Sequence, residues 1–548
     1  MQITFVNSNF REQIIPNFII DFASGLLSLG AVLEKNNYKV KIINLFQLSG
    51  IPQLTDDASF CSNAGRIIVR QGADILGFNS RCDTYPIVLN IARQCKQLNP
   101  QSIILIGGPQ ATATDYDTLK NFPFVDIIVR GEGESTLLDL MHCLKKKRDP
   151  GNVAGITYRK NGNIIRNKPR ELIKNLNTLP LPAYHLIEEY LPNSEELKDG
   201  WAYISIGRGC PHKCTFCSTG MFWQRRYRIR SPENILKEII FLKKNYKINR
   251  FYLGHDNFLT NTKDIERICN ILLGKKINIE WSCSSRVDSI DKGLFEVMSR
   301  SGCKRIFFGI ESGSSKIQKS IKKKIDVSLI PKAIQECRKY NIFAILSFII
   351  GFPNENKEDL NETLKLALNS RLFENCYSHI RLLTPIAGTE IFIKNKRKLY
   401  LKESWADLYL IGNLIKKTIW SKSLIKKYPL IFSSFYCIKL KYLPEQLTYQ
   451  AFIIFSVLIC VYPISSRIAL QDLKFTPLIL IDEFSNWLQD RMNLKGQNNL
   501  PNSKEIIKTF PAFLKESYQQ RHNNNLFVAL QRILNYEYKT MTAATGKK

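Results

Sequence analysis

The sequence has no apolar run long enough to cross a bilayer. Its longest run, residues 451–464, is shorter than a membrane-spanning helix requires and meets a proline. The N-terminus, MQITFVNSNF, has neither the basic start nor the long apolar core of a signal peptide. The default interpretation is therefore a cytoplasmic protein, and contact with a membrane surface through residues 391–464 stays open.

Acidic residues are scarce relative to basic ones. The 48 Asp and Glu face 78 Lys and Arg, for a formal net charge of +30. Such an excess favours nucleic-acid or anionic-membrane partners, but abundant Lys, Asn and Ile along the whole chain favour simple compositional drift. Because 44% of the 548 residues are hydrophobic and 23% are charged, wholesale disorder is excluded.

A disulfide framework is also missing, because eleven of the 14 cysteines are scattered without regular spacing. The other three, Cys210, Cys214 and Cys217, form a CxxxCxxC in GRGCPHKCTFCSTG. A structural zinc site needs four ligands, and the chain has no second CxxC; His212 would complete four ligands only on a cramped loop. Three thiolates around a four-iron cluster leave one iron open for chemistry. The spacing therefore predicts an iron–sulfur cluster.

Residues 1–150 alternate short apolar strands with amphipathic helices, which predicts a flavodoxin-like, doubly wound parallel sheet. Three predicted strand ends, at 79–80, 107–109 and 131–134, are small or glycine-rich. Ligands of such sheets bind beyond the carboxyl ends of the strands. Residues 151–198 read as a linker that carries a hairpin around Asn161-Gly162.

Residues 199–390 return to strand–helix alternation, with six predicted strands. This number fits a partial (β/α)6, TIM-like barrel, whose chemistry lies at the C-terminal strand ends. Residues 391–548 are basic and predicted to be mostly helical.

The cysteine motif and its context resemble the radical S-adenosylmethionine (SAM) enzymes. In that family a CxxxCxxC after the first barrel strand holds a [4Fe-4S] cluster, and its open iron binds SAM, which is cleaved to a 5′-deoxyadenosyl radical. The strand ends LGHDNF, CSSRVDSI, RIFFGIESGS, GFP and LLTPIAGTEIF follow in family order. The resemblance implies that Cys210, Cys214 and Cys217 bind the cluster and that the cofactor contacts Phe216, Asp256, Arg286, Glu311, Ser312, Gly351 and Pro353.

The residues at two of these strand ends also have simpler, purely structural interpretations. His255, beside Asp256, is either a base or a packed, hydrogen-bonded histidine, and Arg286 either meets the cofactor carboxylate or forms a salt bridge. Asp256 also departs from the Gly-Gly-Glu that many family members have at this strand end.

Residues 1–150 resemble the cobalamin-binding domain that precedes the barrel in one large subgroup. The similarity lies in residues 106–113, in residues 129–140 and in the linker LPLPAYHL. The DxHxxG motif that supplies a cobalt ligand in many corrinoid proteins is absent, and His142 is the only histidine before residue 185. A bound corrinoid is therefore expected to lack histidine coordination. The alternative is a domain that keeps the fold without the corrinoid.

The resemblance favours a cobalamin-dependent methyltransferase acting on an unactivated carbon of a small-molecule, lipid or peptide substrate. It implies a one-electron reductant such as flavodoxin or ferredoxin. The alternative is a radical cyclase, rearrangement or oxidation enzyme without methyl transfer. A basic nucleic-acid-binding protein with a structural cluster is disfavoured.

The segment 391–441 is the most basic part of the chain, with 12 Lys or Arg and 2 Asp or Glu. Its interleaved aromatics could stack on bases or anchor at a membrane. The alternative is a helical cap with a solvated basic face. The aromatics in question are Trp405, Tyr409, Trp420, Tyr428, Phe432, Phe435 and Tyr436.

Overall fold

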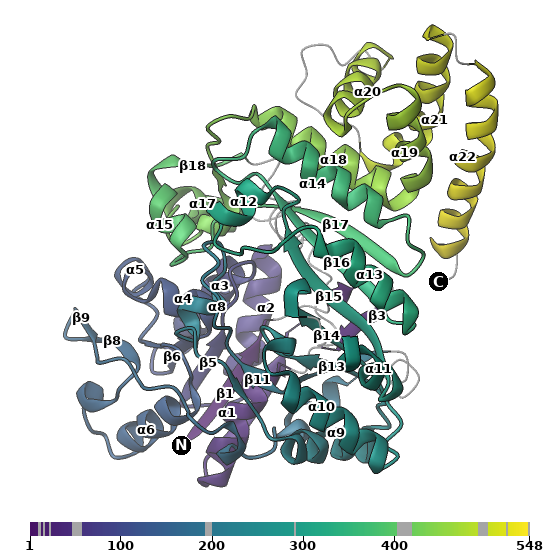
Figure 1. Ribbon diagram of the computed structural model, residues 1–548. Helices are drawn as coiled ribbons and strands as arrows, with labels where there is room; N and C mark the ends of the chain where they lie inside the picture. Colours follow the sequence, from purple (N-terminus) through teal and green to yellow (C-terminus); the bar gives the residue numbers. More distant parts are fainter. Residues whose placement is uncertain are drawn as a thin grey trace. The chain divides into compact units, whose positions relative to one another are not determined.

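The computed structural model describes residues 1–8, 12–14, 17–20, 23–45, 57–191, 200–289, 292–402, 419–491, 502–521 and 524–545 (Figure 1). The chain divides into two compact units. The first comprises Met1–Cys283, Arg300–Cys303 and Thr384–Cys437. The second comprises Ser284–Ser299, Lys304–Leu383 and Ile438–Lys548.

The first unit contains a seven-stranded sheet of order β4-β1-β5-β6-β7-β8-β9. Five of these strands are parallel, as predicted: β1 (Gln2–Asn7), β4 (Lys39–Asn44), β5 (Ile75–Asn79), β6 (Ile103–Gly107) and β7 (Ile127–Val129). The predicted hairpin is present as β8 (Ile156–Lys160) and β9 (Asn163–Arg166). It pairs antiparallel with β7 and therefore extends this sheet instead of standing in a separate linker.

Both faces of this sheet carry buried side chains, because successive residues of a strand point to opposite sides. Val6 and Phe78 belong to a core shared with α2 (Asp57–Val69) and α3 (Tyr85–Leu98). Phe5, the neighbour of Val6, faces the other way, where α1 (Ser24–Lys35) contacts α6 (Glu134–Lys145). This double cover confirms the predicted doubly wound domain.

Part of the basic segment completes the core of the N-terminal domain. Phe432 and Phe435 are fully buried in the same cluster as α2 and α3, and the ring of Trp420 lies 4.8 Å from the guanidinium carbon of Arg93. Tyr428 packs edge-on against Phe122. These aromatic side chains are used for packing inside the N-terminal domain. Trp405 and Tyr409 lie outside the described residues.

Three parallel strands of the predicted barrel begin in the first unit: β10 (Trp201–Ser205), β13 (Arg250–Gly254) and β14 (Glu280–Ser285), of which β14 ends in the second unit. Helices α9 (Pro232–Tyr246) and α10 (Thr262–Gly274) connect them. An N-terminal hairpin that we did not predict, β2 (Glu12–Ile14) and β3 (Asn17–Ile20), adds β3 in parallel beside β10.

The second unit supplies the other three strands, β15 (Cys303–Glu311), β16 (Phe343–Ile350) and β17 (Cys376–Leu382), which are also parallel. Helix α13 (Leu329–Lys339) packs against β16, and α14 (Lys357–Ser370) packs against β16 and β17. Six parallel strands with connecting helices confirm the predicted partial barrel.

The rest of the second unit is helical, as predicted (Figure 1): α18 (Glu445–Val461), α19 (Pro463–Asp472), α20 (Pro477–Arg491), α21 (Ser503–Gln520) and α22 (Asn524–Thr545). The apolar run in α18 is buried against α14, α20 and α21. In the described ranges no single helix meets the length and hydropathy of a membrane span; α18 and α19 do so only together, with a bend of 111° between them.

Candidate active site

A cavity of about 910 Å³ lies beyond the carboxyl ends of β5, β6 and β7. Its floor consists of the predicted small strand ends, including Ser80, Gly107, Gly108 and Gly131. The facing wall comes from barrel residues of the same unit, among them Arg208 and Asp256. A cavity of this size accommodates a large organic cofactor.

Two glycines in the floor have different roles. A Cβ on Gly108 would lie 2.7 Å from the carbonyl oxygen of Ser80, so this glycine permits close packing of the two strand ends. A Cβ on Gly131 would meet no atom within 4 Å, so this glycine leaves open space beside the cavity. An open, glycine-lined floor fits a wide, flat ligand such as a corrinoid, because its ring can approach the backbone.

The cavity offers no free histidine for cobalt among the residues that line it. His255 is the one histidine in its lining. The His255 Nδ1 accepts a hydrogen bond from the Asn257 N–H at 3.1 Å, and its Nε2 lies 3.2 Å from the Arg228 carbonyl oxygen. Burial lowers the pKa of His255 to about 4. The packed interpretation of His255 is therefore correct. His142 lies on the outer surface of α6, against Tyr38.

The three predicted cluster ligands lie together. Cys210, Cys214 and Cys217 line one cavity of about 270 Å³. Burial raises the pKa of the Cys210 thiol to about 11, so ligation of iron must displace its proton. Within the described part of the chain, no group of three or more His, Cys, Asp or Glu is arranged to hold one metal ion. Three thiols spaced around a cavity fit a multi-iron cluster.

The loop with these cysteines is fixed at both ends by Asp256. One carboxylate oxygen accepts from the Gly209 N–H at 2.7 Å, and the other accepts from the Thr219 hydroxyl at 3.1 Å. Gly388, from the predicted sixth strand end, closes the other side of the cavity. Its φ is 83°, and a Cβ there would lie 2.3 Å from the Met221 sulfur. Phe216 lies half-buried on the loop itself.

In the second unit, the acid predicted at the end of β15 is in a strained conformation. Glu311 has a φ of 70°, which is rare for a residue with a side chain. Its carboxylate forms a buried ion pair with Lys323. Such strain is commonly retained where a ligand binds. Ser312, the next residue, shares a 2.9 Å hydrogen bond with the Thr363 hydroxyl and so stabilises the turn.

Arg286 is engaged in a salt bridge, one of the two interpretations we considered. Its Nε donates to Asp288 at 2.9 Å and one Nη donates to Asp288 at 2.5 Å. That Nη also donates to the Lys323 carbonyl oxygen at 2.8 Å. Only 7% of Arg286 is exposed, whereas the Asp288 side chain is 27% exposed, so the arginine is the buried partner of this salt bridge.

The turn after β16 depends on an acid that we did not single out. Gly351, with a φ of 90°, donates its N–H to the Glu355 Oε2 at 2.6 Å. Glu355 is fully buried, and its Oε1 has no hydrogen-bond partner among the described residues. Burial raises the pKa of Glu355 to about 8. The carbonyl oxygen of Pro353 accepts from the Lys441 N–H.

Sequence reasoning also missed two arginines that flank the cysteine loop. Arg208 is on β11 (Gly207–Arg208) and Arg228 is on β12 (Arg228–Ile229). Both pair with glutamates that follow β7 of the N-terminal sheet. The signal available was the charge complementarity between GRGC and the segment RGEGE.

Two family models match the chain. The radical SAM superfamily model matches residues 204–367, and the B12 binding domain model matches residues 22–141. An uncharacterized methyltransferase, PH0819, of Pyrococcus horikoshii is 31% identical over 412 residues, covering 74% of this chain and 86% of the relative. The anaerobic magnesium-protoporphyrin IX monomethyl ester cyclase of Synechocystis is 27% identical over 353 residues, covering 63% and 67%.

Solved structures share the fold. The radical SAM methyltransferase TsrM from Kitasatospora setae, with cobalamin and a [4Fe-4S] cluster bound, aligns with a TM-score of 0.58 at 15% identity, over 72% of this chain and 74% of that one. The cobalamin-dependent radical enzyme OxsB aligns with a TM-score of 0.62 at 16% identity, over 99% and 84%.

Proposed function

The chain belongs to the radical SAM superfamily and carries a B12-binding domain, and from this premise we propose that it is a cobalamin-dependent methyltransferase that acts on an unactivated carbon. The observation that carries the proposal is the position of the 910 Å³ cavity. Its floor is formed by the B12-binding domain, and Gly207, Arg208 and Asp256 in its wall adjoin the cysteine loop. One unit therefore provides space for a corrinoid beside the ligands of a cluster.

When bound, the cluster would supply the electron that cleaves SAM and the corrinoid would supply the methyl group. The protein's part is to hold and orient these groups. Cys210, Cys214 and Cys217 would ligate three irons, and Asp256 would keep their loop in place. We propose that Phe216, Arg286, Glu311, Ser312 and the turn from Gly351 to Pro353 orient SAM. The buried charges of Arg286 and Glu311 and the strained φ of Glu311 support that assignment.

The reaction requires an organic substrate and an electron donor. A one-electron reductant such as flavodoxin or ferredoxin fits this need. The substrate class is open to small molecules, lipids and peptides.

A second candidate function is radical cyclisation or oxidation without methyl transfer. The similarity to the anaerobic cyclase of Synechocystis favours it, because that relative aligns over 353 residues, 63% of this chain.

By-product analysis separates the two functions. A methyltransferase of this design consumes two SAM molecules for each product and should release S-adenosylhomocysteine and 5′-deoxyadenosine in near-equal amounts. Reconstituted enzyme would be supplied with SAM, cobalamin, a reductant and fractions of a host metabolite extract, and both by-products and substrate mass would be followed. Deoxyadenosine alone, with no gain of a methyl mass on any compound that is consumed, would contradict methyl transfer and favour the cyclase.

A further inference from the structure

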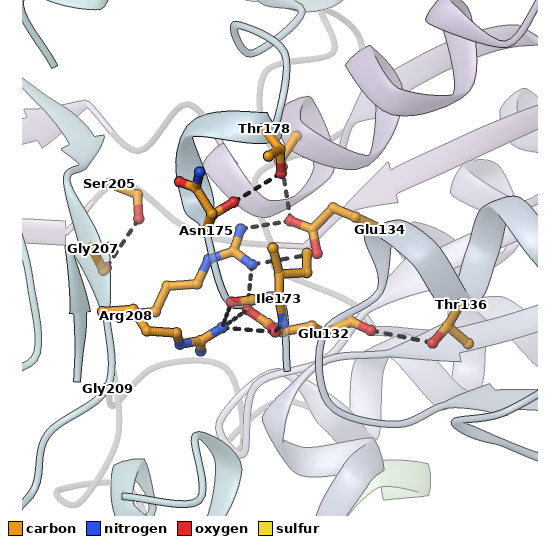
Figure 2. Close-up of polar contacts among 12 residues, drawn as sticks. Glu132, Glu134, Thr136, Ile173, Asn175, Thr178, Ser205, Gly207, Arg208 and Gly209 are labelled. Carbon is orange, nitrogen blue, oxygen red and sulfur yellow. Dashed lines mark hydrogen bonds and ion pairs between the residues drawn. The ribbon is translucent and has the colours of Figure 1, made fainter. Parts of the chain in front are cut away.

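Four charged side chains link the B12-binding domain to the loop that bears the cysteines. Glu132 and Glu134 follow β7, whereas Arg208 and Arg228 lie opposite each other on the β11–β12 pair. Arg208 donates to Glu132 at 2.7 Å and to Glu134 at 2.5 Å, and Arg228 donates to Glu132 at 2.9 Å. Figure 2 shows both carboxylates directed toward Arg208. We call Glu132, Glu134, Arg208 and Arg228 the charge network.

The charge network is nearly excluded from solvent. The exposed fractions of the Glu132 and Glu134 side chains are 3% and 5%, and those of Arg208 and Arg228 are 14% and 9%. Burial opposes ionisation of Glu134, but the charge and hydrogen bonds of Arg208 and a hydrogen bond from Ser28 outweigh it, so the pKa of Glu134 lies below its usual value. The network pairs two arginines with two glutamates, and their formal charges cancel.

Each member of the charge network is tied to another part of the site. The N–H of Ile173, in the connecting segment, donates to Glu132 at 2.7 Å, and the Ile173 carbonyl oxygen accepts from Arg228. The Trp223 ring, which lines the cavity, lies 5.6 Å from both guanidinium carbons. Arg208 precedes Cys210 by two residues. Hydrogen bonds and ion pairs thus connect residues of the cavity with the segment that leads to Cys210.

A buried network of this kind is a costly way to gain stability, because apolar residues of similar volume can do as well. What ion pairs with fixed geometry provide is orientation: the fork of Arg208 binds two carboxylates only in one arrangement of the two segments. The charge network lies where the cavity meets the cysteine loop. We therefore expect its role to be to fix the orientation of the loop relative to the cavity.

We propose that the charge network is a positioning device that sets the distance between the corrinoid cavity and the cluster. The inference rests on the proposed function. Its members are positioning residues, because they act through the Cys210 loop and the cavity wall. Loosening the network should leave both cofactors bound but should vary the distance between them.

The decisive measurement is the magnetic interaction between Co(II) in bound cobalamin and the reduced cluster, observed by electron paramagnetic resonance. It falls steeply with distance and does not depend on turnover. Protein carrying both cofactors would be poised at a potential where both centres are paramagnetic. In the Arg208→Lys and Glu134→Gln variants we expect a weaker and more heterogeneous interaction than in the wild type. The ratio of methylated product to deoxyadenosine should fall by up to about 100-fold, since misplacement of about 1 Å can cost that much.

Asp115→Asn is the matched control. Asp115 is a buried carboxylate of the same domain, pairs with Arg166 at 2.7 Å and with Arg130 at 3.5 Å, and does not line the cavity. Its replacement removes a comparable buried charge, and the magnetic interaction should match that of the wild type.

The outcomes separate the two proposals. If both the Arg208→Lys and Glu134→Gln variants retain cobalamin and about four irons and show the wild-type magnetic interaction, the positioning proposal is wrong, whereas the proposed function is unaffected. Loss of the fold or the cluster in both variants, while Asp115→Asn folds, assigns the network to stability and also overturns positioning. A wild-type protein that retains no cobalamin overturns the proposed function and this inference together.

Discussion

The strand ends of the N-terminal sheet and those of the second unit are built in opposite ways. Beyond β5, β6 and β7 the residues are small, and a cavity of about 910 Å³ is open. Beyond β14, β15 and β16 lie buried residues that are charged or titratable: Arg286, which pairs with Asp288, then Glu311 with Lys323, and Glu355 beneath Gly351. Both regions lie beyond the carboxyl ends of parallel strands, which is where ligands of such sheets bind.

The difference fits the two kinds of ligand that we propose for these regions. A wide macrocycle is recognised mainly by shape, so the first region supplies space and close backbone approach. SAM carries a sulfonium, an ammonium and a carboxylate group and is recognised by these charges. In our proposal the second region therefore supplies charged groups held in a dry environment, where electrostatic interactions are strong. Substitutions should therefore act on volume in the first region and on charge in the second.

The largest effect is expected outside both regions, at the thiols. Cys214→Ala should abolish the brown chromophore and all cleavage of SAM, because a cluster with two protein ligands is not retained. Iron content and deoxyadenosine are measured after anaerobic reconstitution. Cys143→Ala, which alters a cysteine outside the cysteine cavity, is the control and should keep about four irons per chain. Stoichiometric zinc without iron in the wild type would contradict the cluster.

In the charged region, Glu311→Gln removes the carboxylate that faces Lys323. Both side chains are 8% exposed, and breaking a buried pair costs about 3–5 kcal/mol. Urea denaturation should detect this loss. A Glu311→Gln, Lys323→Met double variant should recover most of the stability, because two neutral groups replace the pair. If Glu311 binds SAM, the double variant stays inactive; restored cleavage of SAM would show that Glu311 serves the fold only.

The pH dependence of stability tests the other buried acid. Glu355 has its pKa raised from 4.5 to about 8 by burial. Below pH 4.5 both folded and unfolded chains hold the proton. Between pH 4.5 and 8 only the folded state does, so stability falls as the pH rises and the loss is complete above pH 8, at most a few kcal/mol. Glu355→Gln keeps an acceptor for Gly351 and should be more stable than the wild type at pH 8 but not at pH 4. If the free energy of unfolding has the same pH dependence in the wild type and in Glu355→Gln, then Glu355 is not protonated in the folded state.

In the open region, a single added methyl group should distinguish a glycine that borders the cofactor space, Gly131, from one that permits close packing of the strand ends, Gly108. Gly131→Ala should cost about 1 kcal/mol for its positive φ and should weaken cobalamin binding, because its Cβ enters open space. Gly108→Ala should cost more stability, since its Cβ collides with the Ser80 carbonyl oxygen. Denaturation and equilibrium dialysis with cobalamin measure the two effects. The comparison fails if Gly131→Ala binds cobalamin as tightly as the wild type.

The smallest expected effect is none at all. His142→Ala should leave the absorption spectrum of bound cobalamin unchanged, because this residue lies on the outer surface of α6. The spectrum of the wild type should show no nitrogen coordination by histidine. A spectral change in the variant would mean that His142 reaches cobalt.

Local patterns were sufficient for much of this protein. The spacing of Cys210, Cys214 and Cys217 predicted a shared site, and strand–helix alternation predicted both parallel α/β domains. These signals depend only on residues that are close in sequence. A loop of eight residues brings its own thiols together, and the spacing of apolar residues identifies each strand without reference to the others.

Contacts between distant segments could be decided only by the tertiary structure. The hairpin β8–β9 joins the N-terminal sheet, β3 pairs with β10, and Phe432 and Phe435 fill a core some 300 residues earlier in the chain. The same holds for the charge network, where Arg208 meets Glu132 and Glu134. A sequence shows that opposite charges exist, but which of them are buried together, and in what geometry, depends on how the two segments pack.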